Sequence, residues 1–144
     1  MNVLSEISVS YSQKINKELF IKSSMDSYEC LNQFWQDISL NESFNVMFLN
    51  KSNQVKGIYR LSKGGLDCVI VDVRLLFSIA LKTLSTAIVV AHNHPSGSLT
   101  PSKADDQVTE KIKKAAKFLD IKLLDHLILT PSNGYFSYAD DSRL

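Results

Sequence analysis

The chain has 144 residues, of which 44% are hydrophobic and 22% are charged, and its formal net charge is +1 at pH 7. This length and composition fit one globular domain and exclude a low-complexity chain. The near-zero charge provides no general electrostatic attraction for nucleic acid, and no apolar run approaches the ~18 residues that suggest a membrane-spanning helix.

The N-terminus and the cysteines indicate the compartment. The first residues carry neither the basic region nor the long apolar core of a secretory signal, so we expect a cytoplasmic protein. Cys30 and Cys68 lie far apart in the chain and form no metal-binding motif. We therefore expect both thiols to be reduced.

Predicted strands and helices interleave along the chain. Residues 1–20 are expected to be an N-terminal extension, in which residues 7–11 either add an edge strand or remain loose. Asp26 and Glu29 predict a capping box for a first helix that continues to Ile38. The later predicted elements are strand 44–49, strand 54–61, strand 68–71, helix 74–84, strand 86–91, helix 102–119, strand 121–130 and strand 135–138. This order predicts a single α/β domain with a mixed β-sheet flanked by helices.

Two histidines, His92 and His94, follow the apolar segment 86–91 at alternate positions. Because alternate side chains of a strand point to the same face, both imidazoles can reach one metal ion. After a turn, the helix that begins at Ser102 is expected to fold Asp105 back towards the strand end. Imidazole and carboxylate groups both suit zinc, and three protein ligands leave the open position of a catalytic zinc site.

These residues also have a purely structural interpretation. Ser102 and Asp105 fit a Ser-x-x-Asp capping box before an apolar-periodic helix. The two roles are compatible, since the helix dipole favours a carboxylate in the first turn. Asp106 competes with Asp105 as a ligand, but the two lie about 100° apart around the helix, so we expect only one of them to face the site.

The spacing His-x-His, seven residues, Ser, two residues, Asp resembles the signature of the JAMM metalloproteases, also called the MPN+ or JAB domain. The residues that match it are His92, His94, Ser102 and Asp105. The longer strings at residues 92–97, 100–102 and 124–126 resemble the RadC branch of that superfamily. The resemblance covers residues 21–144 and implies a JAB/MPN-like fold of the cytidine-deaminase-like architecture.

The resemblance also implies a reaction, the hydrolysis of a peptide or isopeptide amide by a zinc-activated water. His92, His94 and Asp105 would bind zinc, which would polarise the scissile carbonyl. Ser102 would donate a hydrogen bond to the developing oxyanion.

A glutamate on an upstream segment serves as the general base in the family, and Glu42 is the matching position. Nothing in Glu42 by itself indicates catalysis, because a lone glutamate before a strand is normally a solvated loop residue. Glu29 and Glu110 are weaker candidates, since no motif surrounds Glu29 and Glu110 lies well inside the helix after Asp105. Only the resemblance selects Glu42.

Two further polar residues accompany the motif. His126 lies in the apolar run 123–129, and we favour a buried core histidine paired with a polar neighbour. The alternative is that His126 orients a zinc ligand, because ligating imidazoles commonly need an outer partner. Asn93 points to the opposite strand face from the two histidines and is expected to be structural.

The chain departs from the RadC pattern in two places. About twenty residues before the matching region leave no room for the N-terminal helical DNA-binding region of full-length RadC relatives, which weakens a DNA-repair assignment. Val73 and Arg74 stand where the family tends to show Pro-Arg. That second change leaves the expected metal ligands untouched.

Two functions follow. The first is a JAMM-type zinc metallopeptidase that acts on a peptide or protein substrate. The alternative is a non-catalytic RadC-like interaction module associated with DNA repair or DNA metabolism. The charge does not support nucleic acid as a partner, and no membrane partner is expected. A lysine cluster on the helix after the motif is expected to be its solvated face; its members are Lys111, Lys113, Lys114 and Lys117. The sequence does not determine the substrate or the oligomeric state.

Overall fold

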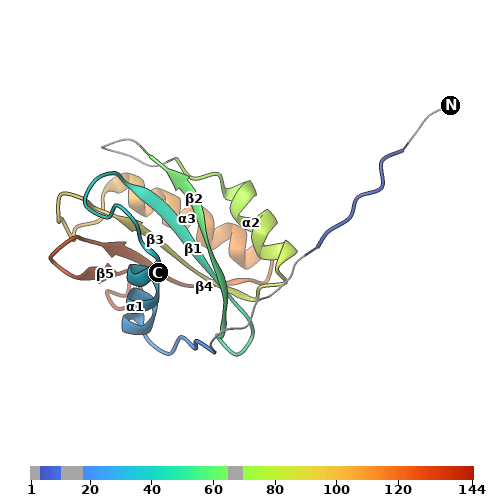
Figure 1. Ribbon diagram of the computed structural model, residues 1–144, viewed down its shortest axis with the longest axis horizontal. Helices are drawn as coiled ribbons and strands as arrows, with labels where there is room; N and C mark the ends of the chain where they lie inside the picture. The colour runs from blue at the N-terminus through green and yellow to red at the C-terminus, as the bar shows by residue number, and fades with distance from the viewer. Residues whose placement is uncertain (1–3, 11–17, 65–69) are drawn as a thin grey trace.

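A mixed β-sheet forms the centre of the fold (Figure 1). The computed structural model describes residues 4–10, 18–64 and 70–144. Within these residues the sheet has five strands in the order β2-β1-β3-β4-β5. The strands are β1 (Ser43–Leu49), β2 (Val55–Lys63), β3 (Ala87–Asn93), β4 (Lys122–Leu129) and β5 (Tyr135–Ser137). The pair β3 and β4 is parallel and the other neighbouring pairs are antiparallel, which confirms the predicted α/β fold with a mixed sheet.

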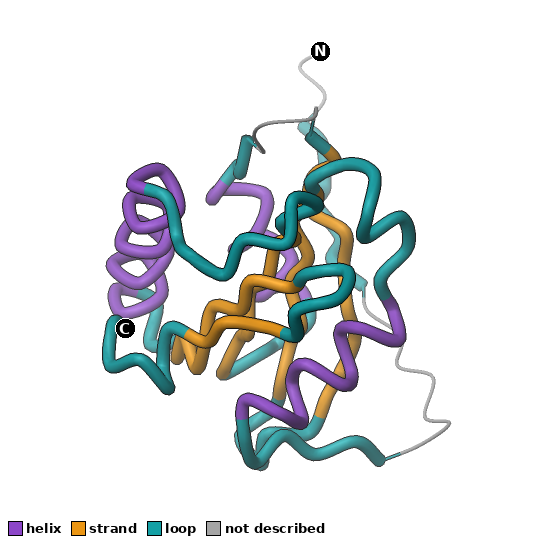
Figure 2. Tube along the Cα trace, turned by 90° about the vertical axis from the view of Figure 1, so that its left-hand side faces the viewer, coloured by secondary structure: helices purple, strands orange, loops and turns teal. Residues whose placement is uncertain are grey.

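Helices cover both faces of this sheet (Figures 1 and 2). They are α1 (Ser24–Phe34), α2 (Val73–Lys82) and α3 (Lys103–Phe118). One core packs the sheet against α2 and α3, through residues such as Leu76 and Ile112. The second core packs the opposite face against α1, through Leu31. Among the described residues, no helix has the length and apolar character needed to cross a lipid bilayer.

The two central strands, β1 and β3, are buried along their whole length. Successive side chains of a strand point to opposite faces, so a strand covered on both sides must be apolar nearly throughout. In β1, Phe44 and Val46 enter the core beneath α2 and α3, while Met47 and Leu49 enter the core beneath α1. Burial on both faces explains why the segment that forms β1 is a nearly continuous apolar run in the sequence.

The first helix differs from the prediction at both ends. Ser23 is the N-cap and its hydroxyl accepts a hydrogen bond from the backbone N–H of Asp26, so the expected capping box of Asp26 and Glu29 is wrong. Ser23 and Asp26 are both good capping residues by type. The helix ends at Phe34, and Ile38 lies beyond it.

One strand that the sequence allowed and one that it predicted are not found among the described residues. Residues 7–10 are exposed and form no strand, and residue 11 lies outside the description. Half of the expected strand 68–71 lies in the undescribed segment 65–69, while Ile70 and Val71 belong to no strand. Cys68 lies in the same undescribed segment, and Cys30 is a half-buried free thiol whose pKa is raised by burial.

Three chain segments meet at one edge of the sheet. In the antiparallel pairing of β1 with β3, Phe44 lies opposite His92, so the start of β1 adjoins the end of β3. The backbone N–H of His94 donates to the carbonyl of Leu129, so the extended course of β3 continues beyond its last residue. The connection from β3 then leads into the N-terminus of α3, which returns to the same edge.

Candidate metal centre

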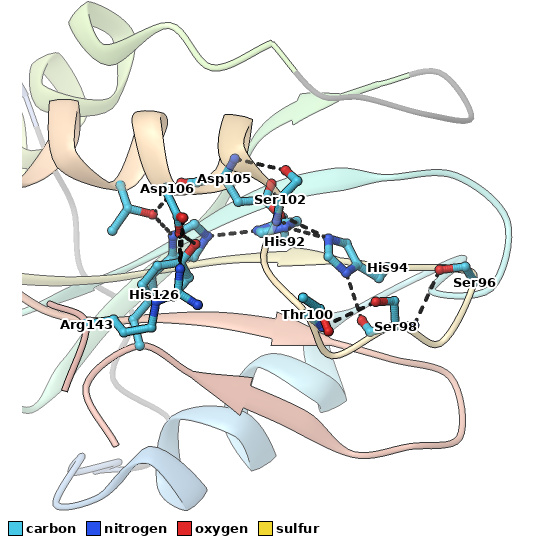
Figure 3. A network of polar contacts seen from close by, with 12 residues as sticks. His92, His94, Ser96, Ser98, Thr100, Ser102, Asp105, Asp106, His126 and Arg143 are labelled. Atoms are coloured by element: carbon cyan, nitrogen blue, oxygen red, sulfur yellow. Dashed lines mark hydrogen bonds and ion pairs between the residues drawn. The ribbon is translucent and has the colours of Figure 1, made fainter. Parts of the chain in front are cut away.

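His92, His94 and Asp105 form a tight cluster at this edge of the sheet (Figure 3). The Nε2 atom of His92 lies 3.2 Å from Oδ1 of Asp105, and Nε2 of His94 lies 3.3 Å from Oδ2. The two Nε2 atoms are 3.0 Å apart. Tetrahedral zinc with bonds of about 2.0–2.1 Å places its ligand atoms about 3.3–3.4 Å from one another. The ligand groups of the three residues are therefore spaced much as around a zinc-sized ion, and the cluster could hold a metal ion.

The cluster is closed on the protein side and open on the solvent side. The side chain of His92 is 4% exposed, whereas those of His94 and Asp105 are 11% and 17% exposed. Exposure is thus concentrated at the two ligands that lie beyond the strand. Catalytic zinc sites bind a water or substrate atom as a fourth ligand, and such an atom would reach the cluster from the side of His94 and Asp105.

The electrostatics of the cluster favour an ionised Asp105. Burial raises the pKa of Asp105, but the imidazoles of His92 and His94 beside it outweigh burial and hold that pKa well below its usual range. In return, the hydrogen bond to Asp105 raises the pKa of His94, while burial opposes this shift. A metal ion would therefore find a carboxylate already ionised, and at His94 it would compete with a proton.

Ser102 and Asp105 form the predicted capping box of α3. The hydroxyl of Ser102 accepts from the backbone N–H of Asp105 at 3.0 Å, and Oδ2 of Asp105 accepts from the backbone N–H of Ser102 at 2.8 Å. The capping interpretation is confirmed, and it is compatible with metal binding because it orients the carboxylate towards the histidines. A hydroxyl that accepts one bond keeps its own proton as a donor, so Ser102 can still donate to a group at the cluster.

Asp106 points away from the cluster, as the helical angle predicts. Its two oxygens each lie 2.8 Å from the same guanidinium nitrogen of Arg143, and Oδ1 also accepts from the hydroxyl of Tyr138 at 2.8 Å. Burial and the bond to Asp106 raise the pKa of Tyr138. The competition between the two neighbouring aspartates is therefore decided in favour of Asp105.

Glu42 lies beside the cluster, although it is 50 residues away from His92 in the chain. Phe44 faces His92 across the β1–β3 pair, so continuing this register by two residues places Glu42 opposite His94. The carboxylate of Glu42 contributes to the raised pKa of His94, which shows that the two groups are within electrostatic reach. The structure does not bring Glu29 or Glu110 to the site. Glu29 is exposed on α1, across the sheet, and Glu110 is exposed on α3 beside Lys114.

Asn93 holds the segment that leads to Glu42. Its side chain is buried; it accepts from the backbone N–H of Ser43 at 2.7 Å and donates to the carbonyls of Ile38 and Asn41 at 2.8 and 2.9 Å. Asn93 is therefore structural, as expected. It lies on the face opposite His92 and anchors the chain on either side of the predicted general base.

His126 is buried on β4 between two polar partners. Its Nε2 lies 2.8 Å from Nδ1 of His92, and its Nδ1 lies 2.6 Å from the hydroxyl of Thr109 on α3. The ring of Tyr138 stacks on it with centroids 4.9 Å apart. Burial lowers the pKa of His126 well below its ordinary value. The favoured interpretation of a core histidine with polar partners is confirmed, and one partner is itself a candidate ligand.

Thr109 is the site residue that the sequence analysis missed. It follows Asp105 by four residues, which is one helical turn, so both side chains lie on the same face of α3. Its hydroxyl donates to the carbonyl of Asp105 at 2.7 Å. Helical spacing from Asp105 was the available signal, but threonine is common in amphipathic helices and carries no motif by itself.

Comparison with known proteins identifies relatives over most of the chain. The sequence model of the RadC-like JAB domain matches residues 21–143. A UPF0758 protein of Flavobacterium johnsoniae is 46% identical over 121 residues, which are 84% of this chain and 52% of that relative. A UPF0758 protein of Porphyromonas gingivalis is 38% identical over 92% of this chain and 58% of that relative. A UPF0758 protein of Streptococcus sanguinis is 39% identical over 72% of this chain and 45% of that relative. The chain thus spans about half the length of the curated relatives it matches.

Proposed function

The chain belongs to the family of RadC-like JAB domains, and we propose that it is a zinc-dependent metallohydrolase that cleaves a peptide or isopeptide amide bond. One observation carries the proposal: the ligand atoms of His92, His94 and Asp105 converge on one point beside Glu42 and Ser102. A structural zinc site would need a fourth protein ligand. Among the described residues, only these three form such a cluster.

The chain's own residues account for the steps of such a reaction. Bound zinc would supply a Lewis acid for the scissile carbonyl and would lower the pKa of a bound water from about 15.7 to about 7. Glu42 would accept the proton of that water and later deliver it to the leaving amine. The hydroxyl of Ser102 would donate to the oxyanion that forms on the substrate carbonyl.

Each residue is held in place for its role by the surrounding fold. Asp105 is oriented by its bond to the backbone of Ser102 in the capping box. His94 is oriented by the carbonyl of Ser98, which accepts from its Nδ1 at 2.8 Å and leaves Nε2 facing the cluster. Asn93 anchors the segment that carries Glu42. Such preorganisation places the reacting groups before substrate binds.

The test replaces Glu42 by glutamine in zinc-loaded protein. We expect Glu42→Gln to keep one zinc per chain, measured by elemental mass spectrometry, and to lower kcat for fluorogenic peptide and isopeptide substrates by roughly 10²–10⁴-fold. Glu110→Gln is the matched control, because Glu110 is exposed on α3 and its carboxylate lies 3.9 Å from the ammonium group of Lys114. It should retain full activity.

Two outcomes would oppose the proposal. Hydrolysis at the wild-type rate in Glu42→Gln would mean that Glu42 is not the general base. Stoichiometric zinc in the wild type without hydrolysis of either bond type would favour the alternative, in which the domain is a metal-bearing interaction module.

A further inference from the structure

We propose that Thr109 and His126 are positioning residues that hold His92 in the tautomer protonated at Nδ1, so that Nε2 presents a lone pair to the metal position. The proposal rests on the proposed function only in naming a metal ion as the group that Nε2 would bind. The tautomer itself follows from the hydrogen bonds of the protein. Nothing in the family resemblance or in the metal cluster assigns a role to Thr109.

Three buried groups form a hydrogen-bonded chain that ends at His92 (Figure 3). It runs from the carbonyl of Asp105 to the hydroxyl of Thr109 at 2.7 Å, on to Nδ1 of His126 at 2.6 Å, and from Nε2 of His126 to Nδ1 of His92 at 2.8 Å. His126 is 0% exposed, Thr109 is 4% exposed and His92 is 3% exposed. Such burial shields these bonds from exchange with solvent, so each atom must find its partner within the protein.

The direction of every bond in this chain follows from its first member. A carbonyl oxygen can only accept, so the short contact with Asp105 uses the single hydroxyl proton of Thr109. The hydroxyl of Tyr138 donates its own proton to Asp106. In its bond with Thr109 it can therefore only accept, so it is a second acceptor for the hydroxyl proton of Thr109. With its proton engaged in this way, Thr109 can only accept from Nδ1 of His126.

The same reasoning then passes from His126 to His92. A neutral imidazole carries one N–H, so His126 with its proton on Nδ1 accepts at Nε2. That acceptor requires a donor at Nδ1 of His92. His92 is thus protonated at Nδ1, and its Nε2 keeps a lone pair. In the metal-free protein this lone pair faces Nε2 of His94 at 3.0 Å, and a proton on that nitrogen can be shared between His92 and Asp105.

Both histidine ligands carry a proton on Nδ1, and this proton is fixed by a different route in each. Nδ1 of His94 donates directly to the carbonyl of Ser98, and this backbone acceptor fixes its orientation. His92 has an imidazole as its partner, and an imidazole nitrogen can either donate or accept. The direction of that bond is therefore decided only at the next link, by Thr109. The chain also joins two ligands, because it begins at the backbone of Asp105 and ends at the side chain of His92.

The experiment reads the tautomers directly in metal-free protein. Long-range ¹H–¹⁵N correlation spectra at about pH 8, above the ordinary imidazole pKa of about 6.5, report which ring nitrogen carries the proton. In the wild type we expect His92, His94 and His126 each to be protonated at Nδ1. In Thr109→Val, which keeps the side-chain shape but removes the hydroxyl, we expect His92 and His126 to become mixtures of both tautomers while His94 stays unchanged. Thr109→Ser should restore the wild-type spectrum.

Zinc affinity provides the second measurement. Removing the outer partner of a ligating histidine typically weakens metal binding by about 10–100-fold. We expect that loss in Thr109→Val, measured by competition with a chelator, and near wild-type affinity in Thr109→Ser. A merely structural Thr109 would change the free energy of unfolding and leave the His92 tautomer as it is.

Protonation of His92 at Nε2 in the wild type would overturn the proposal, and this spectrum needs no variant to fold. An unchanged His92 tautomer in folded Thr109→Val would also overturn it. These results are separate from a failure of the proposed function. A wild type with the expected tautomers but without zinc binding or hydrolysis would support the hydrogen-bonded chain and refute the proposed enzymatic function.

Discussion

Replacing Asp105 with asparagine should remove the metal from the site while the domain stays folded. Asparagine keeps an oxygen that can accept the backbone N–H of Ser102, so the capping box of α3 can persist. The change removes the carboxylate that contacts both histidines, at 3.2 and 3.3 Å. Structural zinc sites with four ligands bind with about 10–16 kcal/mol, so one ligand accounts for roughly 3–4 kcal/mol. The dissociation constant should therefore rise about 10²–10³-fold.

The adjacent residue provides a matched control. Asp106→Asn makes the same chemical change one position along the helix, but Asp106 faces Arg143 and Tyr138 instead of the histidines. We expect this variant to bind zinc like the wild type. Both partners of its ion pair are more than a third exposed, so its loss should cost at most about 1 kcal/mol of unfolding free energy.

The assay combines zinc content by elemental mass spectrometry with the dissociation constant from chelator competition, and circular dichroism verifies the fold. Wild-type zinc affinity in Asp105→Asn would mean that Asp105 serves only as part of the capping box. Loss of zinc in folded Asp106→Asn would mean that the ligand has been assigned to the wrong aspartate. Either result would refute the geometric argument that places Asp105 in the cluster.

Three other predictions test the site and its support. Zinc affinity should increase as pH rises through the pKa of His94, which Asp105 raises above its ordinary value. The reason is that zinc binds the neutral imidazole and must displace a proton from the charged one. Calorimetric titrations from about pH 6 to 8 that show no change in zinc affinity would contradict this prediction. Asn93→Ala removes the hydrogen bonds by which the buried Asn93 side chain holds the chain on both sides of Glu42, so it should lower the free energy of unfolding by about 1–3 kcal/mol and reduce hydrolysis more than zinc content. Ile112→Ala, at a fully buried position under the sheet, should cost about 2–5 kcal/mol in denaturant unfolding, and a cost below about 1 kcal/mol would disprove close packing there.

The first helix shows why its boundaries could not be read from the sequence. Ser23 and Asp26 are equally good capping residues by type, and the expected box used Asp26. In the structure Ser24 contacts the hydroxyl of Tyr135 at 2.9 Å, and the ring of Tyr28 stacks on Tyr135 with centroids 4.5 Å apart. These contacts from β5 hold the first turn of α1 against the sheet, and residues more than 100 positions away cannot be recognised in a local pattern.

The histidine–aspartate cluster could be predicted because its geometry is local. His92 and His94 alternate along a strand, and Asp105 follows in the first turn of the next helix. Strand alternation and helix capping are properties of short segments, so fourteen residues of sequence contained most of the necessary information. The choice between Asp105 and Asp106 remained open only because it depends on which face of α3 packs against β3 and β4.

The remaining parts of the site depend on contacts between distant segments. By itself the sequence determined the alternation of strands and helices, the apolar centre of the sheet and the local metal motif, because backbone periodicity and capping act over a few residues. Only the tertiary structure decided that the start of β1 adjoins the end of β3, which brings Glu42 within electrostatic reach of His94. Strand register is set by the packing of both faces, and a slip of one residue would turn Glu42 to the other face. The contact of Thr109 with His126 likewise exists only because α3 packs across β4.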